Sequence, residues 1–181
     1  PWEDVAVMCP HVIWDDRKNE YRMWYSGGAK FEPDAIGYAT SPDGLIWTKH
    51  TDNPIFRPDP ANPWEQERVT GCQVIRQHGW YLMFYIGFED QRRARIGVAR
   101  SRDGITGWQR HPDNPIIRPH QGRWDADSTY KPYAIFDGQQ WLLWYNGRRG
   151  SLEQIGLATH KGWDLGFPQA SGRTGAASGS R

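Results

Sequence analysis

The hydrophobic positions of the chain fall into short runs separated by polar turns, and no window shows a helical period. In the first third of the chain these runs predict four short strands, at residues 5–13, 21–26, 35–40 and 46–50. The turn "SPDG", which precedes the last of them, carries Asp and Gly where tight turns favour them. The pattern therefore predicts antiparallel β-structure.

The same pattern returns about every 60 residues. The segments "YRMWYSGG", "YLMFYIGF" and "WLLWYNGR" are in register, so that Tyr25, Tyr85 and Tyr145 lie 60 residues apart. A pair of Trp and an acidic residue precedes each unit, at residues 2–3, 64–65 and 124–125. Units of four antiparallel strands at a fixed period are typical of a β-propeller.

We therefore expect an all-β fold, a β-propeller built of four-stranded antiparallel blades. The propeller is predicted to occupy residues 1–167, with blades at about 1–60, 61–120 and 121–167. The third unit matches the repeated pattern less well from "THKGWDLGF" on, and this segment is expected to keep a short last strand. Residues 168–181 are rich in Gly, Ala and Ser and are predicted to be a disordered tail.

The residues that recur between units are interpreted as structural. Asp43 and Asp103 are expected to accept backbone N–H bonds in their turns, and Trp47 and Trp108 to pack between blades. The acidic residues that follow Trp2, Trp64 and Trp124 are expected to cap the backbone.

Composition and charge narrow the classes of partner. Eleven Trp and an aromatic content of 14% suit a β core, and they also suit stacking on sugar rings. A net charge of +1 argues against nucleic acid, and no apolar run is long enough to span a membrane. Cys9 and Cys72 lack metal-ligand spacing and are expected to be buried free thiols or, in a secreted protein, a disulfide. The sequence does not indicate a cellular compartment.

The pattern that runs from "YRMWYSGG" through "IGYATSPDG" to "DNPIF" resembles the five-bladed β-propeller glycosidases, the group of glycoside hydrolase families 32, 43, 68 and 130. The resemblance covers about residues 1–167 and is specific for the fold. It implies a funnel lined by the first strand of each blade, where three blades each contribute a carboxylate. Glycoside cleavage needs such groups, because one acid protonates the leaving oxygen while a second carboxylate acts from the opposite side.

The positions that match the family motifs depart from this pattern. The base of family 43 corresponds to Cys9, Gly71 or Lys131, and its acid to Met8, Thr70 or Tyr130, so neither position is acidic in any unit. An E-D-x-R element like that of family 130 occurs at residues 89–92, but it falls in a loop that we expect to be solvated.

The remaining acidic residues near the predicted funnel strands are the candidate catalytic groups, namely Asp127, Glu67 and Asp4. Nearby polar side chains could bind sugar hydroxyls or phosphate, and these candidates are Arg68, Lys131, Tyr130, Tyr133, Gln73 and His11. Lys131 stands out because the other units carry Cys and Gly at its position. No metal and no cofactor is expected.

Three functions are compatible with this sequence. The first is a glycoside hydrolase that acts on carbohydrate through funnel carboxylates. The alternatives are a non-catalytic carbohydrate-binding or interaction propeller and a phosphate-dependent glycoside phosphorylase. Five blades of this size would need about 300 residues, so the chain is either a fragment or completes the ring by pairing with another copy. If it is stable alone, we expect a homo-oligomer, because an open arc of blades would expose strand edges.

Overall fold

The computed structural model describes residues 2–168, which form three antiparallel sheets with a short 3-10 helix between the first two. The first sheet has the order β1 (Ala6–Asp15), β2 (Glu20–Gly28), β3 (Ala35–Ser41) and β4 (Thr48–Lys49). After helix η1 (Pro63–Glu65), the second sheet has the order β5 (Arg68–Gln77), β6 (Trp80–Phe88), β7 (Ala94–Ser101) and β8 (Gln109–Arg110). The third sheet contains β9 (Ser128–Phe136), β10 (Gln140–Arg149) and β11 (Leu152–Lys161), with β10 in the middle.

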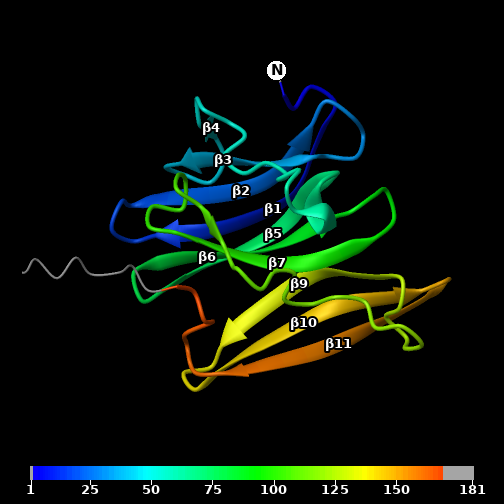
Figure 1. Ribbon diagram of the computed structural model, residues 1–181. Helices are drawn as coiled ribbons and strands as arrows, with labels where there is room; N and C mark the ends of the chain where they lie inside the picture. The colour runs from blue at the N-terminus through cyan, green and yellow to red at the C-terminus, as the bar shows by residue number, and fades with distance from the viewer. Residues whose placement is uncertain (1, 169–181) are drawn as a thin grey trace, which may run out of the picture.

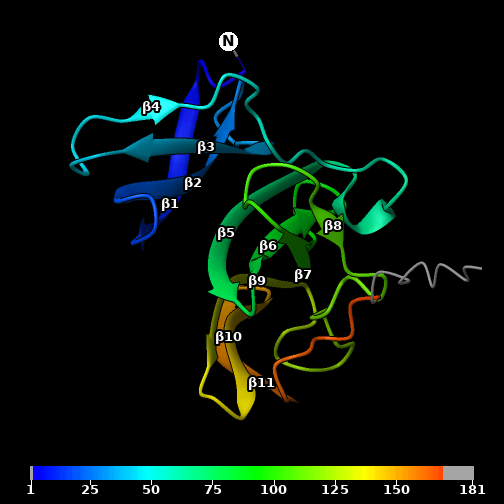
Figure 2. The same cartoon turned by 90° about the vertical axis from the view of Figure 1, so that its left-hand side faces the viewer.

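The three sheets follow one another in chain order, with the second sheet between the other two (Figure 1, Figure 2). In the first two sheets the strands become shorter from the first to the last, whereas the three strands of the third sheet are of similar length. The prediction of an all-β fold built from propeller-like antiparallel blades is therefore confirmed. Most of the predicted tail, residues 169–181, lies outside the described residues.

The third blade departs from the expected four strands. Residues 159–161 belong to β11, and no strand follows them as far as residue 168. Gly162 and Gly166 both have positive φ, 77° and 86°, and turn the chain away from the edge of β11. Leu165 and Phe167 then pack against the second and third sheets, so the expected short last strand is wrong.

Two apolar clusters hold the sheets together, one at each interface. The first joins Trp24 and Ile36 of the first sheet to Val74 and Met83 of the second. The second joins the second sheet to the third, and in it the rings of Phe84 and Trp141 lie 5.6 Å apart. Alternation along each strand supplies these faces, since residues two apart point to the same side of a sheet.

The recurring pair of Trp and acid forms a clamp inside each blade. The ring of Trp64 lies over the β6 and β7 backbones, so close that a Cβ on Gly97 would be 2.5 Å from it. Glu65 is fully buried and accepts hydrogen bonds from the Tyr85 hydroxyl at 2.8 Å and from Arg110 Nε at 2.5 Å. The role is structural as expected, but the partners are side chains and not the backbone cap predicted.

The two SPDG-type turns fold as predicted. Asp43 accepts the N–H groups of Leu45 and Ile46, and Asp103 accepts those of Ile105 and Thr106, all at 2.8–2.9 Å. Burial opposes ionisation of Asp103, but these bonds and the Thr106 hydroxyl lower its pKa to about 2.

The two turn tryptophans differ. Trp108 packs against Phe56 of the first blade, with ring centroids 6.2 Å apart, and so lies between blades as expected. The Trp47 indole instead donates to Gly44 O within its own turn, at 3.2 Å. The described residues place no sheet against that side of the first blade, so Trp47 has no neighbouring blade to pack on.

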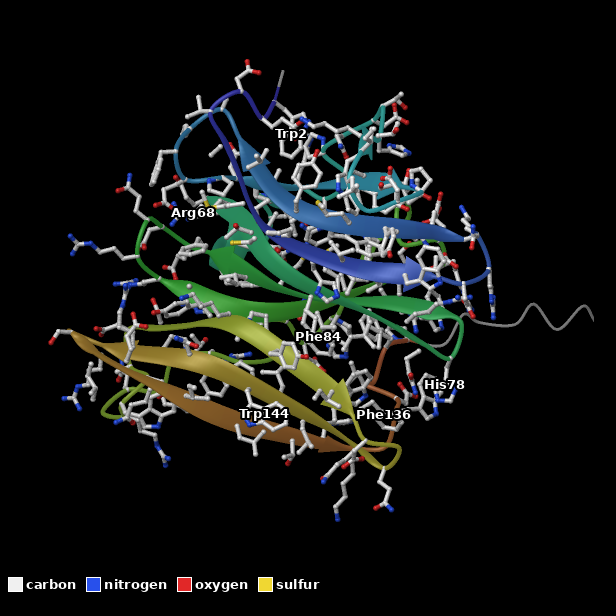
Figure 3. The ribbon with its side chains drawn as sticks, turned by 180° about the vertical axis from the view of Figure 1, so that it is seen from behind. Trp2, Arg68, His78, Phe84, Phe136 and Trp144 are labelled. Atoms are coloured by element: carbon white, nitrogen blue, oxygen red, sulfur yellow. The ribbon has the colours of Figure 1, made fainter. Side chains whose placement is uncertain are left out.

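The outer face of the third sheet is open. Ile155 and Leu157 are 73% and 52% exposed, whereas their counterparts in the second blade, Ile96 and Val98, are both 0% exposed. Trp144 also points away from the second sheet (Figure 3). The third sheet thus presents an apolar face of the kind that the other two bury against the next blade. Within residues 2–168 no helix has the length and apolar character needed to cross a membrane.

Candidate functional site

The first strands of the three blades share a bulge at the same place. The register with the neighbouring strand shifts there in each blade, and the bulged residues Cys9, Gly71 and Lys131 have φ of 53°, 46° and 52°. These are the positions that match the family 43 base. The backbone is therefore the same in all three blades, while the side chain is a thiol, a hydrogen or an amine and never a carboxylate.

The two cysteines are free thiols, so the disulfide alternative is not what the structure shows. Cys9 is exposed, which contradicts the expected burial, and Cys72 is partly buried. Burial raises the pKa of the Cys72 thiol, which keeps it protonated and unreactive.

Three candidate binding residues occupy the same repeated position, two residues after the bulge in the first strand of each blade, and two of them bond to the next blade. His11 Nε2 lies 2.9 Å from Val74 O of the second blade, and burial lowers the pKa of the imidazole, so the neutral ring donates this bond. Gln73 donates to Ala134 O at 3.0 Å and accepts from Ala134 N at 2.5 Å. The third member, Tyr133, is 57% exposed on the open face. His11 and Gln73 are thus engaged in holding neighbouring blades together.

A cleft of about 390 Å³ lies between the first and second blades and contains carboxylates from both. We call it the acidic cleft, and its lining residues are Lys30, Phe31, Glu32, Asp34, Glu67, Arg68 and Gln91. The first four belong to the β2–β3 loop, Glu67 and Arg68 stand at the start of β5, and Gln91 lies in the β6–β7 loop.

Arg68 forms one wall of the acidic cleft and is only 8% exposed (Figure 3). Its guanidinium lies 3.9 Å from the centre of the Phe88 ring, and Nη2 donates to Gln91 O at 3.4 Å. Nη2 is also 3.7 Å from Glu32 Oε2. Among the described residues, Arg68 Nε is buried and has no hydrogen-bond partner.

A second cleft, of about 980 Å³, lies at the equivalent place between the second and third blades. We call it the arginine cleft, and it is lined by Arg92, Arg93, Arg95, Pro115, Arg118, Pro119, Gln121, Ala126, Asp127, Arg148 and Gly150. Asp127 is its single carboxylate, and Asp127 Oδ2 accepts the Gly150 N–H at 2.7 Å, which links the turn between β10 and β11 to the residue before β9.

The three predicted catalytic acids are not brought together. Glu67 lines the acidic cleft, Asp127 lines the arginine cleft, and Asp4 lines neither. Of the remaining binding candidates, the Tyr130 hydroxyl donates to Glu153, and Lys131 Nζ is 5.7 Å from the centre of the Tyr130 ring. The catalytic roles of these acids stay predictions.

Two groups of residues that line the clefts were not predicted as site residues from the sequence. Glu32 and Asp34 join Glu67 in one cleft, but they lie in a loop outside the repeated landmarks. The arginines of the second cleft were not among the predicted candidates, although the run "QRRAR" at residues 91–95 is a local signal for a cluster. Among residues 2–168, no three His, Cys, Asp or Glu side chains are grouped as metal ligands would be.

Comparison with solved structures finds this fold in carbohydrate-active enzymes. A family 117 glycoside hydrolase from the marine bacterium Zobellia galactanivorans matches with a TM-score of 0.72 and 18% identity, over 88% of this chain and 53% of its own. An N-acetylgalactosamine deacetylase from F. plautii, in complex with blood group B trisaccharide, matches with a TM-score of 0.71 and 14% identity, over 88% of this chain and 51% of its own. A β-1,2-mannobiose phosphorylase from Listeria innocua, in complex with β-1,2-mannobiose, matches with a TM-score of 0.67 and 18% identity, over 86% of this chain and 44% of its own.

This chain spans about half the length of those structures. No family model and no curated protein matches it. The resemblance inferred from the sequence, to propeller glycosidase-like proteins, is therefore confirmed at the level of the fold. A deacetylase, a hydrolase and a phosphorylase share this fold, so the chemistry has to be argued from the side chains.

Proposed function

We propose that this protein is a carbohydrate-active glycoside hydrolase whose carboxylates act in a cleft between blades. The observation that carries the proposal is the acidic cleft, where Glu67 of the second blade meets Glu32 and Asp34 of the first. Hydrolysis of a glycoside needs two carboxyl groups in one pocket, one as the acid and one as the base or nucleophile. The exposed Phe31 ring at the same cleft offers a face on which a sugar ring could stack.

In this proposal Glu67 is one of the two reacting carboxyl groups and a carboxylate of the β2–β3 loop is the other. The guanidinium of Arg68, which lines the same cleft, would hold a sugar hydroxyl beside them. Asp127 is the single carboxylate in the lining of the arginine cleft, and Asp4 lines neither cleft, so both rank below Glu67 as reacting groups.

The test is a panel of aryl glycosides and oligosaccharides assayed with four variants of the full chain. Glu67→Gln is expected to lower kcat/KM by about 10²- to 10⁴-fold, because a general acid or base contributes that much. Asp127→Asn and Asp4→Asn test the other two candidates, and Asp52→Asn, an exposed loop residue outside both clefts, is the control. Absence of turnover across the panel, or equal activity of Glu67→Gln and the control, would sink the proposal.

The second candidate is a non-catalytic carbohydrate-binding propeller. It is favoured by the bulge positions Cys9, Gly71 and Lys131, none of which carries a carboxylate. Binding of an oligosaccharide without turnover would identify it. Turnover that requires inorganic phosphate would instead identify a glycoside phosphorylase.

We further propose that a second copy of the chain covers the open face of the third sheet. The exposed Ile155 and Leu157 stand where the second blade buries Ile96 and Val98, so this face suits another blade of the same design. Light scattering is expected to give at least twice the chain mass of 20.9 kDa. A monomeric mass over the whole concentration range would refute a homo-oligomer.

A further inference from the structure

The arginine cleft and the acidic cleft occupy equivalent places in the repeat but carry opposite charge. Ile36 and Ile96 pair with equivalent residues of β2 and β6, so positions in the two loops correspond at a spacing of 60. By that spacing Arg92 replaces Glu32, and Arg95 replaces Ala35. The acidic cleft has two cations and three carboxylates in its lining, whereas the arginine cleft has five guanidinium groups and one carboxylate.

Neighbouring acids neutralise only part of this charge. Arg95 is 2.7 Å from Glu89, and Arg93 lies within 4 Å of Glu89 and Asp90. Among the described residues, Arg92, Arg118 and Arg148 form no ion pair with a carboxylate. The one carboxylate of the lining, Asp127, is already engaged by the Gly150 N–H. Cations gathered without counter-charges favour an anion among them.

The cleft is also anchored across the blade interface. Arg148 Nη2 donates to Arg92 O at 3.1 Å, and the Ser128 hydroxyl donates to the same oxygen at 2.6 Å. These bonds fix the backbone of the β6–β7 loop and leave the Arg92 side chain exposed at the cleft. The arginines are therefore presented on a tethered loop, and a planar guanidinium binds an oxyanion with two parallel hydrogen bonds.

We propose that the arginine cleft binds an anionic saccharide through its oxyanion groups, either sulfate esters or uronate carboxylates. The choice of a saccharide rests on the proposed function, and the choice of an oxyanion rests on the arginines alone. A volume of about 980 Å³ exceeds what a single inorganic ion needs and suits a ligand of several sugar units. Nucleic acid fits less well, because the whole chain carries only +1 and this basic surface is confined to one cleft.

The experiment is isothermal titration of the full chain with three oligosaccharides matched in length, one sulfated, one a non-sulfated uronate and one neutral. Either anionic ligand is expected to bind and the neutral one to bind at least about tenfold more weakly, since charge-assisted hydrogen bonds exceed neutral ones. The stronger of the two anionic ligands tells which oxyanion the cleft takes. A single-stranded oligonucleotide is the fourth ligand.

Two cleft variants and one matched control locate the binding. Arg92→Gln and Arg118→Gln are each expected to raise the Kd of the anionic saccharide by about tenfold. Arg17→Gln, an exposed arginine of the β1–β2 turn that lines neither cleft, is expected to leave the Kd unchanged. The backbone oxygen of residue 92 accepts its bonds from Ser128 and Arg148 whatever the side chain is. Arg92→Gln is therefore expected to fold even if Arg118→Gln does not.

Several outcomes would overturn the inference. These are equal binding of neutral and anionic saccharides, an equal loss in Arg17→Gln, or tighter binding of the oligonucleotide than of either anionic saccharide. Failure here is distinguishable from failure of the proposed function, because the titration needs no turnover. Anion binding that depends on Arg92 in a protein inactive on every glycoside would uphold this inference and reject the hydrolase.

Discussion

The ion pair between Arg110 and Glu65 ties the outer strand of the second blade to the start of its first strand. Arg110 Nε lies 2.5 Å from Glu65 Oε1, and the Arg110 and Glu65 side chains are 24% and 0% exposed. The equivalent pair of the first blade, Lys49 and Glu3, is also 2.5 Å apart, but the Lys49 side chain is 60% exposed. The repeat thus supplies two such pairs in the same protein, and they differ in the exposure of the cation, since the Glu3 side chain is only 9% exposed.

We predict that Arg110→Met destabilises the protein by about 3 kcal/mol, because it leaves a buried carboxylate without its cation. The figure lies at the lower end of the usual range for such a loss, since Glu65 keeps its hydrogen bonds from Tyr85 and Asn62. The guanidinium of Arg110 also lies over the Phe56 ring, 4.2 Å from its centre, and Arg110→Met removes this contact as well. Lys49→Met removes a cation that is 60% exposed and is expected to cost less than Arg110→Met, because water already screens the charge of the exposed ammonium.

The cost of Arg110→Met should also depend on pH. Burial raises the pKa of the Glu65 carboxyl, while Arg110 and the Tyr85 hydroxyl oppose this rise. Without Arg110 the folded pKa rises further above the unfolded value. A raised folded pKa contributes stability that is fully present below the unfolded pKa and is lost as pH rises through the folded pKa. The variant is therefore expected to be most destabilised at neutral pH and to recover toward wild type in mild acid.

The assay is urea unfolding followed by tryptophan fluorescence, at neutral and at mildly acidic pH. In thermal unfolding, a loss of about 3 kcal/mol corresponds to a Tm about 6–12 °C lower for a chain of this length. Equal losses for the Arg110 and Lys49 variants would refute the argument from burial. A loss in Arg110→Met that stays the same at both pH values would refute the role assigned to the Glu65 carboxylate.

Two further predictions concern contacts inside and between the blades. Gly97→Ala places a Cβ 2.5 Å from the Trp64 ring and is expected to cost about 1–3 kcal/mol in urea unfolding, so a neutral result would contradict the clamp. Gln73→Leu leaves the backbone N–H and C=O of Ala134 without their partner, and a cost of about 1–3 kcal/mol is expected. Faster hydrogen exchange at the Ala134 amide is its specific readout, and an unchanged exchange rate would show that Gln73 does not join the second and third blades.

The sequence predicted those parts of the fold that local signals determine. Alternating hydrophobic runs predicted the strands. The residue types at Asp43 and Asp103 were enough to predict the two turns. The missing fourth strand of the third blade was not predictable in this way, because "THKGWDLGF" carries acceptable strand residues. Its path is decided by the burial of Leu165 and Phe167 against other blades, which is a tertiary effect.

The candidate site was only partly predictable for a related reason. Glu67 and Arg68 follow a repeated landmark and were found, whereas Glu32 and Asp34 reach the same cleft from a loop of another blade. A cleft between blades combines segments that are far apart in the chain. Its charge can be judged only when both of its walls are known.

The bulge of the first strands shows how shape and chemistry are separated in this chain. A left-handed φ is natural for Gly71, but at Cys9 and Lys131 it costs on the order of 1 kcal/mol or more. The fold bears that cost twice, so the bulge is required by the architecture whatever the side chain. Function must then lie where the side chains differ between equivalent positions of a shared backbone. Among the described clefts such a difference is the exchange of Glu32 for Arg92, and on it rest both proposals, acid–base chemistry in one cleft and anion binding in its counterpart.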